Sequence, residues 1–169
     1  ALSAARKLRK PNSDVEVTPL LTKITPENVR ELLKDADLAI DGMDNMEARY
    51  ILNEGCVREG IPFVHGGIHG LAGEVTTIIP GKTPCFECIF PGRPEARRPL
   101  PAFGATAALV ASLQVMEAIK LLAGFGELLA GRMLYINGET MEFGVIEIER
   151  NPNCPACGRS GGAFEEETG

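Results

Sequence analysis

The chain has 169 residues, 44% of them hydrophobic and 24% charged, and this composition predicts one domain with a sizeable core. The formal net charge of −6 and the absence of Trp exclude a basic, base-stacking surface, so we expect no nucleic-acid partner. We also expect no membrane partner and a cytoplasmic location, because no apolar run is predicted to reach membrane-spanning length and no charged-then-apolar leader is found.

The first half of the chain alternates predicted helices and strands. A cap at Asp44-Asn45 and a helix end at Gly60 bound one of these helices. Short β-branched or apolar runs predict strands, whereas Gly66-Gly67 and Gly70 favour a flexible turn. Helices are thus predicted at 1–10, 26–34 and 46–59, and strands at 15–17, 38–40, 62–64 and 74–79.

The second half predicts a long helix and a β-hairpin. Residues 91–101 contain four prolines and three arginines, which predicts a mobile crossover loop. Residues 102–122 are rich in Ala, Leu, Val and Met, and we expect a mostly buried helix that also packs against a second subunit. Strands are predicted at 133–136 and 145–148, and a disordered tail at 159–169. The fold is therefore predicted to be α/β, with a partial, mainly parallel Rossmann-like sheet, an antiparallel extension and one domain over 1–158.

Two C-x-x-C pairs lie far apart in the sequence, Cys85 with Cys88 and Cys154 with Cys157. Each sits in a proline- or glycine-containing stretch that suits a tight turn, and together they offer the four thiolates that a structural zinc ion prefers. A zinc knuckle is therefore favoured over a disulfide or redox pair, which suits secreted or thioredoxin-like proteins. The fifth cysteine, Cys56, is predicted to be a small buried hydrophobic residue.

The candidate reactive residues follow the predicted strand 38–40. Asp41 and Asp44 lie where a parallel strand is followed by a helix, the position at which open α/β sheets bind ligands. Two carboxylates there suit Mg²⁺ and, through it, a triphosphate, while Arg49 begins the next helical turn and can orient an anion. The alternative is that Asp44 and Asn45 only cap the helix and that Arg49 pairs with a surface acid.

Six stretches of the chain carry a resemblance to a known family. They are DGMDNMEARYILN at 41–53, GIPFV at 60–64, GEVT at 73–76, PCFEC at 84–88, SLQVMEAIKLL at 112–122 and RNPNCPACG at 150–158. In type, order and spacing they resemble the ThiF/MoeB/HesA family, the prokaryotic relatives of the ubiquitin-activating enzymes. The resemblance covers nearly the whole chain apart from the tail.

This resemblance implies an enzyme that uses Mg·ATP to adenylate the C-terminal glycine of a ubiquitin-like sulfur-carrier protein, in molybdopterin, thiamin or related sulfur transfer. Asp44 matches the family's metal and phosphate ligand, and Asn45 and Arg49 match its neighbours in the D-N-x-x-x-R motif. The four paired cysteines match the ligands of a structural zinc ion. The family also implies a homodimer through the long apolar helix.

The chain departs from the family in two respects. The glycine-rich ATP-binding half with its G-x-G-x-x-G turn is not in this sequence, so we expect this chain alone to bind ATP poorly and to be inactive. No cysteine lies between Cys88 and Cys154, so a thioester or persulfide step in the crossover loop is not expected. Two alternatives stay open: a catalytically incomplete carrier-binding fragment or paralogue, and a nicotinamide-dependent oxidoreductase.

The remaining polar candidates are two histidines and the loop arginines. His65 and His69 flank the glycine pair, but no carboxylate is predicted to orient them, so we expect a structural role for both. The arginines at 93, 97 and 98 either meet an acidic surface of the carrier or are solvated loop charges.

Overall fold

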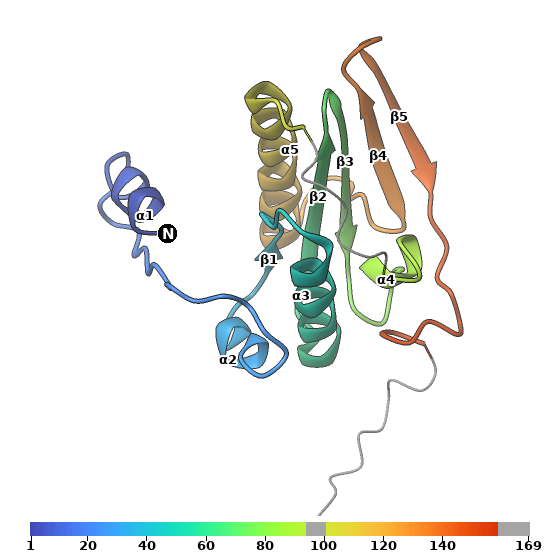
Figure 1. Cartoon of the computed structure of the whole chain (residues 1–169), viewed down its shortest axis with the longest axis horizontal. Coiled ribbons are helices and arrows are strands. Elements are labelled where there is room, and N and C mark those ends of the chain that lie inside the picture. The colour runs from blue at the N-terminus through green and yellow to red at the C-terminus, as the bar shows by residue number, and fades with distance from the viewer. Residues whose placement is uncertain (94–100, 159–169) are drawn as a thin grey trace, which may run out of the picture.

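The computed structural model describes residues 1–93 and 101–158 and shows a mixed α/β fold (Figure 1). Its helices are α1 (Leu2–Leu8), α2 (Val29–Leu33), α3 (Met46–Glu59), α4 (Phe86–Ile89) and α5 (Gly104–Ala123). Its strands are β1 (Ala39–Ile40), β2 (Phe63–His69), β3 (Ala72–Ile78), β4 (Arg132–Asn137) and β5 (Glu142–Glu147). Most of the predicted crossover loop and all of the predicted tail lie outside the described residues.

The five described strands form one sheet in the order β1-β2-β3-β4-β5. β1 and β2 pair in parallel, whereas the other three pairs are antiparallel. β2 and β3 are antiparallel because they are joined by a tight turn at Gly70, whose φ of 60° is costly for other residues. The α/β fold with an antiparallel extension is therefore confirmed, and within the described residues the antiparallel part is the larger one.

The helices cover both faces of the sheet. Strand side chains alternate between the faces, so Phe63 packs with Phe86 of α4 and Tyr50 of α3, while Val64 packs with Val110 of α5. Each face therefore has its own apolar cluster, and Figure 1 shows α5 on one side of the strands and α3 and α4 on the other. α1 lies apart from the sheet in the same view.

Helix α3 has the bounds that the sequence predicts. The side chain of Asn45 accepts a hydrogen bond from the amide of Ala48 at 2.8 Å, and Gly60 ends the helix in the left-handed conformation with a φ of 71°. Two other predictions were wrong. Residues 15–17 form no strand, and Gly66-Gly67 form no turn but lie within β2, which is longer than predicted.

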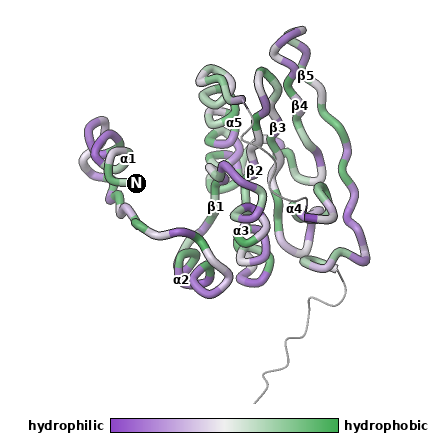
Figure 2. The backbone as a smooth tube through the Cα atoms, viewed as in Figure 1, coloured by the Kyte–Doolittle hydropathy of each residue, from purple (hydrophilic) through white to green (hydrophobic). Residues whose placement is uncertain are grey.

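Helix α5 is less buried than predicted. Its buried residues form one stripe that is largely polar, whereas its other face is apolar, as the hydropathy colours of Figure 2 show. Valine, methionine, isoleucine and leucine side chains on that face are about half exposed, namely Val115, Met116, Ile119 and Leu122. By length and composition α5 could cross a membrane, contrary to the prediction that no run is long enough, but a single helix of this kind is weak evidence for a span.

Candidate functional site

The candidate site lies where the chain leaves β1 and enters α3. Asp41 follows β1 directly, and its amide donates to the carbonyl of Val64 at 3.0 Å, so the parallel pairing extends to this residue. Asp44 is exposed, and its Oδ1 accepts a hydrogen bond from the side-chain amide of Asn45 at 3.0 Å. Since Asn45 also caps α3, the capping interpretation is correct for Asn45. Asp44 presents its carboxylate at the surface, at the end of a parallel strand.

Arg49 does not pair with a surface acid. Its Nε lies 2.9 Å from Oδ2 of Asp41, whose side chain is fully buried. Its Nη2 donates to the carbonyls of Met43 at 2.8 Å and Gly66 at 3.3 Å. Among the described residues Nη1 has no hydrogen-bond partner, and the side chain is 16% exposed. The guanidinium is thus fixed on one side and free to receive an anion on the other.

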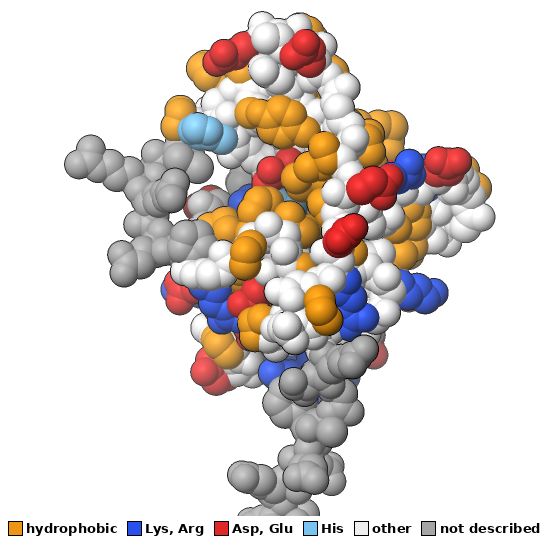
Figure 3. All heavy atoms as spheres, turned by 90° about the vertical axis from the view of Figure 1, so that its right-hand side faces the viewer, with side chains coloured by type: hydrophobic (Ala, Val, Ile, Leu, Met, Phe, Trp, Pro, Cys, Tyr) orange, Lys and Arg blue, Asp and Glu red, His pale blue; other side chains and the backbone are white. Residues whose placement is uncertain are grey.

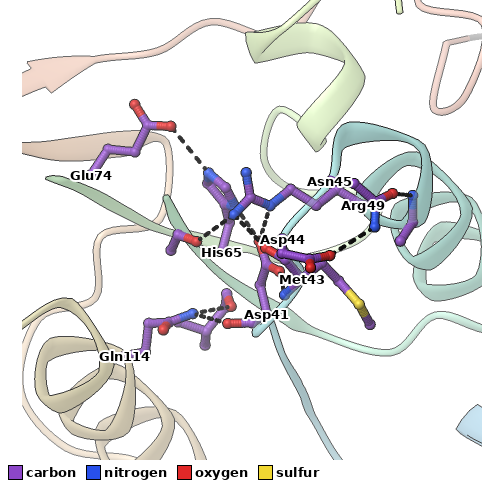
Figure 4. A network of polar contacts seen from close by, with 11 residues as sticks. Asp41, Met43, Asp44, Asn45, Arg49, His65, Glu74 and Gln114 are labelled. Carbon is purple, nitrogen blue, oxygen red and sulfur yellow. Dashed lines mark hydrogen bonds and ion pairs between the residues drawn. The ribbon is translucent and has the colours of Figure 1, made fainter. Parts of the chain in front are cut away.

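His65 lies beneath this guanidinium with no exposed surface. Its Nδ1 is 2.7 Å from Oδ2 of Asp41 and its Nε2 is 3.4 Å from Oε1 of Glu74, so each ring nitrogen faces a carboxylate (Figure 4). The expectation that no carboxylate orients His65 was wrong. His69, by contrast, is exposed at the end of β2.

The pKa of His65 is raised above its ordinary value. Burial is the largest influence and lowers it, but the hydrogen bonds to Asp41 and Glu74 and the negative charge of Asp41 together outweigh burial and the opposing charge of Arg49. The two carboxylates therefore favour the protonated form of the His65 ring.

Helix α5 supports the site from the other face of the sheet. The side-chain amide of Gln114 donates to the carbonyls of Asp41 at 2.9 Å and Val64 at 3.1 Å, where the parallel pairing of β1 with β2 ends. Gly66 makes this approach possible, because a Cβ there would lie 2.4 Å from Cδ of Gln114. Gly66, which was predicted to lie in a turn, is instead required because Gln114 packs against it.

Sequence reasoning missed Glu74, and it grouped the carboxylate of Asp41 with that of Asp44 rather than with Arg49 and His65. Glu74 stands on β3 opposite Gly67 of β2, and this pairing places its carboxylate beside the ring of His65. Asp41 follows β1, and Glu74 lies within β3, 33 positions further along the chain. Only the strand register reveals that both acids face His65. The available signal was the alternation of β2, which puts His65 and Gly67 on one face.

The four paired cysteines lie together, as predicted. Their sulfur atoms all lie within 4.8 Å of one another, and three of the separations are 3.4, 3.6 and 3.9 Å. A disulfide would need about 2.05 Å, whereas a tetrahedral zinc ion with bonds of about 2.3 Å places sulfurs roughly 3.8 Å apart. The cluster therefore fits a metal such as zinc. Cys56 is buried elsewhere in the core, where burial raises its pKa to about 12.

The cysteine cluster and the candidate site are joined by one aromatic side chain. Phe86 follows Cys85 in the sequence, is fully buried, and packs edge-on against His65 with ring centroids 4.9 Å apart. Its amide donates to the side chain of Asn53 in α3 at 2.9 Å. The short helix α4 thus carries two of the cysteines and also forms the floor beneath the histidine.

The comparisons with known proteins identify the family. The ThiF family profile matches residues 1–156. The chain belongs to the ThiF family. It is 40% identical over 167 residues to the SAMP-activating enzyme E1 of Haloferax volcanii, and the matched region covers 95% of this chain and 61% of that protein. It is 36% identical over 169 residues to the sulfur carrier protein adenylyltransferase of Thermus thermophilus, and the matched region covers 94% of this chain and 62% of that protein.

The fold of this ThiF-family chain is also found in solved structures. The crystal structure of E. coli MccB with ATP superposes with a TM-score of 0.76 and 23% identity, over 90% of this chain and 48% of that one. At this identity the likeness shows the fold alone. The chain spans about three fifths of the length of the curated relatives named above.

Proposed function

We propose that the protein containing this chain is a cytoplasmic adenylyltransferase that activates the C-terminal glycine of a ubiquitin-like sulfur-carrier protein with ATP. The observation that carries the proposal is that an exposed Asp44 and the half-free guanidinium of Arg49 both follow the end of the same parallel strand. Ligands bind at such strand ends in open α/β sheets. The relatives named as adenylyltransferases support the same reaction class.

In this proposal the carrier's terminal carboxylate attacks the α-phosphorus of ATP. A bond forms between a carboxylate oxygen and that phosphorus, and the bond to the bridging oxygen breaks, so that pyrophosphate leaves with the electron pair. Asp44 is the proposed ligand of Mg²⁺, which supplies positive charge that neutralises the phosphate oxygens. Nη1 of Arg49 is positioned to hold an anionic oxygen, and Asn45 fixes the carboxylate of Asp44. The remaining ATP contacts are proposed to come from outside this chain.

We propose zinc as the occupant of the cysteine cluster, with a structural role. Four thiolates that coordinate one ion leave no position open for a substrate. The cluster ties residues 85–88 to residues 154–157, and Arg150 reinforces it by donating to the carbonyls of Cys157 and Gly81. Zinc would therefore fix α4, and through Phe86 the floor of the site.

A homodimer is the proposed assembly, with α5 at its interface. α5 turns Thr106, Gln114 and Glu117 toward the sheet and leaves a row of apolar side chains about half exposed, whereas a helix that faces water has polar residues on its outer face. Beside it, a depression of about 470 Å³ is lined mostly by apolar side chains, including Phe125. A second copy of this face would bury both.

The carrier itself is proposed to contact the β4–β5 hairpin. All six residues of β5 are exposed, and Figure 3, which views the molecule from this side, shows apolar side chains among acidic ones. Phe143, Val145 and Ile146 are each about half exposed. An apolar surface of this kind on an edge strand suits a protein partner.

The proposal is tested by incubating the full-length protein with Mg·ATP and its cognate carrier and measuring the carrier's intact mass. We expect a carrier species heavier by one adenylate, and none with a carrier that lacks its terminal glycine. If the full-length protein binds the carrier but forms no adenylate, the carrier-binding alternative is correct instead.

A further inference from the structure

The buried cluster beneath Arg49 contains a histidine that the proposed reaction does not use. His65 has no exposed surface, and both of its ring nitrogens face carboxylates, Asp41 at 2.7 Å and Glu74 at 3.4 Å. An ionised carboxylate only accepts hydrogen bonds, so both contacts are satisfied together only when both nitrogens carry protons. The ring is then an imidazolium ion.

One oxygen links this histidine to the arginine. Oδ2 of Asp41 lies 2.7 Å from Nδ1 of His65 and 2.9 Å from Nε of Arg49, while Oδ1 accepts from the amide of Met43 at 2.8 Å. The carboxylate is therefore held on three sides. Figure 4 shows the ring and the guanidinium meeting at this carboxylate, with Glu74 on the far side of the ring.

We propose that His65 is a positioning residue: held between Asp41 and Glu74 with both ring nitrogens protonated, it donates from Nδ1 to the carboxylate that orients Arg49. The groups that face it are Asp41 after β1, Arg49 on α3 and Glu74 on β3, and the ring of Phe86 on α4 closes the remaining side. Because Glu74 is partly exposed at 26%, it connects the buried cluster to the surface of the sheet.

The donor at Nδ1 gives His65 its effect on Arg49. Without that hydrogen bond, the buried carboxylate of Asp41 is held only by Arg49 and the amide of Met43. Asp41 then turns more freely and the guanidinium loses its fixed direction. Groups that orient a ligand-binding residue typically change activity about 10- to 100-fold when they are removed.

Two substitutions separate the two contacts of the ring. In His65→Asn the side-chain amide replaces Nδ1 and can still donate to Asp41, whereas in His65→Gln it reaches the position of Nε2 and contacts Glu74 instead. The proposal predicts that His65→Asn keeps the orientation of Arg49 and that His65→Gln loses it. A role in packing alone predicts the opposite order, because Gln fills more of the space.

The first measurement is independent of any reaction. In the full-length protein labelled with ¹⁵N, we expect slowly exchanging protons on both ring nitrogens of His65 at pH 7. We also expect slow rotation of the Arg49 guanidinium about its Nε–Cζ bond, which His65→Asn retains and His65→Gln loses. An unprotonated ring nitrogen at pH 7, or an Arg49 signal that both variants leave unchanged, would overturn the proposal.

The second measurement rests on the proposed function. If the protein adenylates a carrier, we expect kcat to fall about 10- to 100-fold in His65→Gln, with a smaller fall in His65→Asn and little change in the KM for the carrier. Equal kcat losses in the two variants would contradict the proposal. Absence of adenylation by the wild-type protein would contradict the proposed function alone, since the NMR result stands apart from it.

Discussion

At the scale of single residues, Gly66 shows how packing sets the geometry of the site. Its lack of a side chain lets Gln114 reach the carbonyls of Asp41 and Val64, which end the only parallel pair among the described strands. These carbonyls lie on the edge that presents Asp44. A change at Gly66 therefore disturbs the site from the opposite face of the sheet.

Replacing Gly66 by alanine should destabilise the protein. The new Cβ would lie 2.4 Å from Gln114, so the amide must move and its two hydrogen bonds weaken. We expect a loss of about 1–3 kcal/mol in the free energy of unfolding, measured by chemical denaturation. Gly144→Ala is the matched control, because no atom lies within 4 Å of a Cβ there and stability should not fall. Equal stability of the two variants would refute this packing argument.

The elevated pKa of His65 predicts a dependence of stability on pH. A group whose pKa is higher in the folded state stabilises the fold fully below its unfolded pKa, near 6.5, and this contribution is lost as the pH rises through the folded pKa. The stability difference between the wild type and His65→Asn should therefore be larger at pH 6 than at pH 9. A constant difference across this range, in thermal or denaturant unfolding, would contradict the shift.

At the scale of elements, α4 shows what the sequence does and does not predict. The two C-x-x-C pairs identify the cysteine cluster because metal ligands have characteristic spacing, and the cap and glycine stop fix the bounds of α3. Neither signal predicts a four-residue helix at Phe86–Ile89. The contact of Phe86 with His65, like that of His65 with Glu74, depends on the register and packing of elements far apart in the sequence.

Removing one thiolate should release the proposed zinc ion. We expect about one zinc per chain in the purified protein by elemental analysis, a strongly reduced content in Cys88→Ser, and a lower melting temperature, since a structural ion contributes folding free energy. Cys56→Ala should retain its zinc, because Cys56 lies outside the cluster. Full zinc content in Cys88→Ser would contradict the assignment.

At the scale of the whole molecule, the sequence motifs predict the family, but they do not predict which surfaces are exposed. The mixed sheet and the ThiF-family membership agree with the predictions, because periodicity and motif spacing are local properties. The burial of α5 differs from the prediction. An apolar helix is expected to be buried, but its sequence does not show which element covers it. In the described residues that cover is missing from one face.

The exposed face of α5 predicts a change of oligomeric state. Placing a charge at its centre, as in Ile119→Glu, should convert a dimer of the full-length protein to a monomer in light-scattering measurements, because a buried unpaired charge is costly. Leu21→Glu, at an exposed leucine outside the helix, should remain dimeric. A wild-type monomer, or a dimer that tolerates Ile119→Glu, would exclude this interface.

In the proposed function the chemistry depends on Asp44, in the loop that follows β1. Carrier-dependent exchange of labelled pyrophosphate into ATP, measured with the full-length protein, tests it most directly. We expect exchange in the wild type and in Glu47→Gln, an exposed acid in the first turn of the same helix, and a loss of at least about 100-fold in Asp44→Ala. Exchange that Asp44→Ala leaves intact, or a wild-type protein that shows none, would contradict the account.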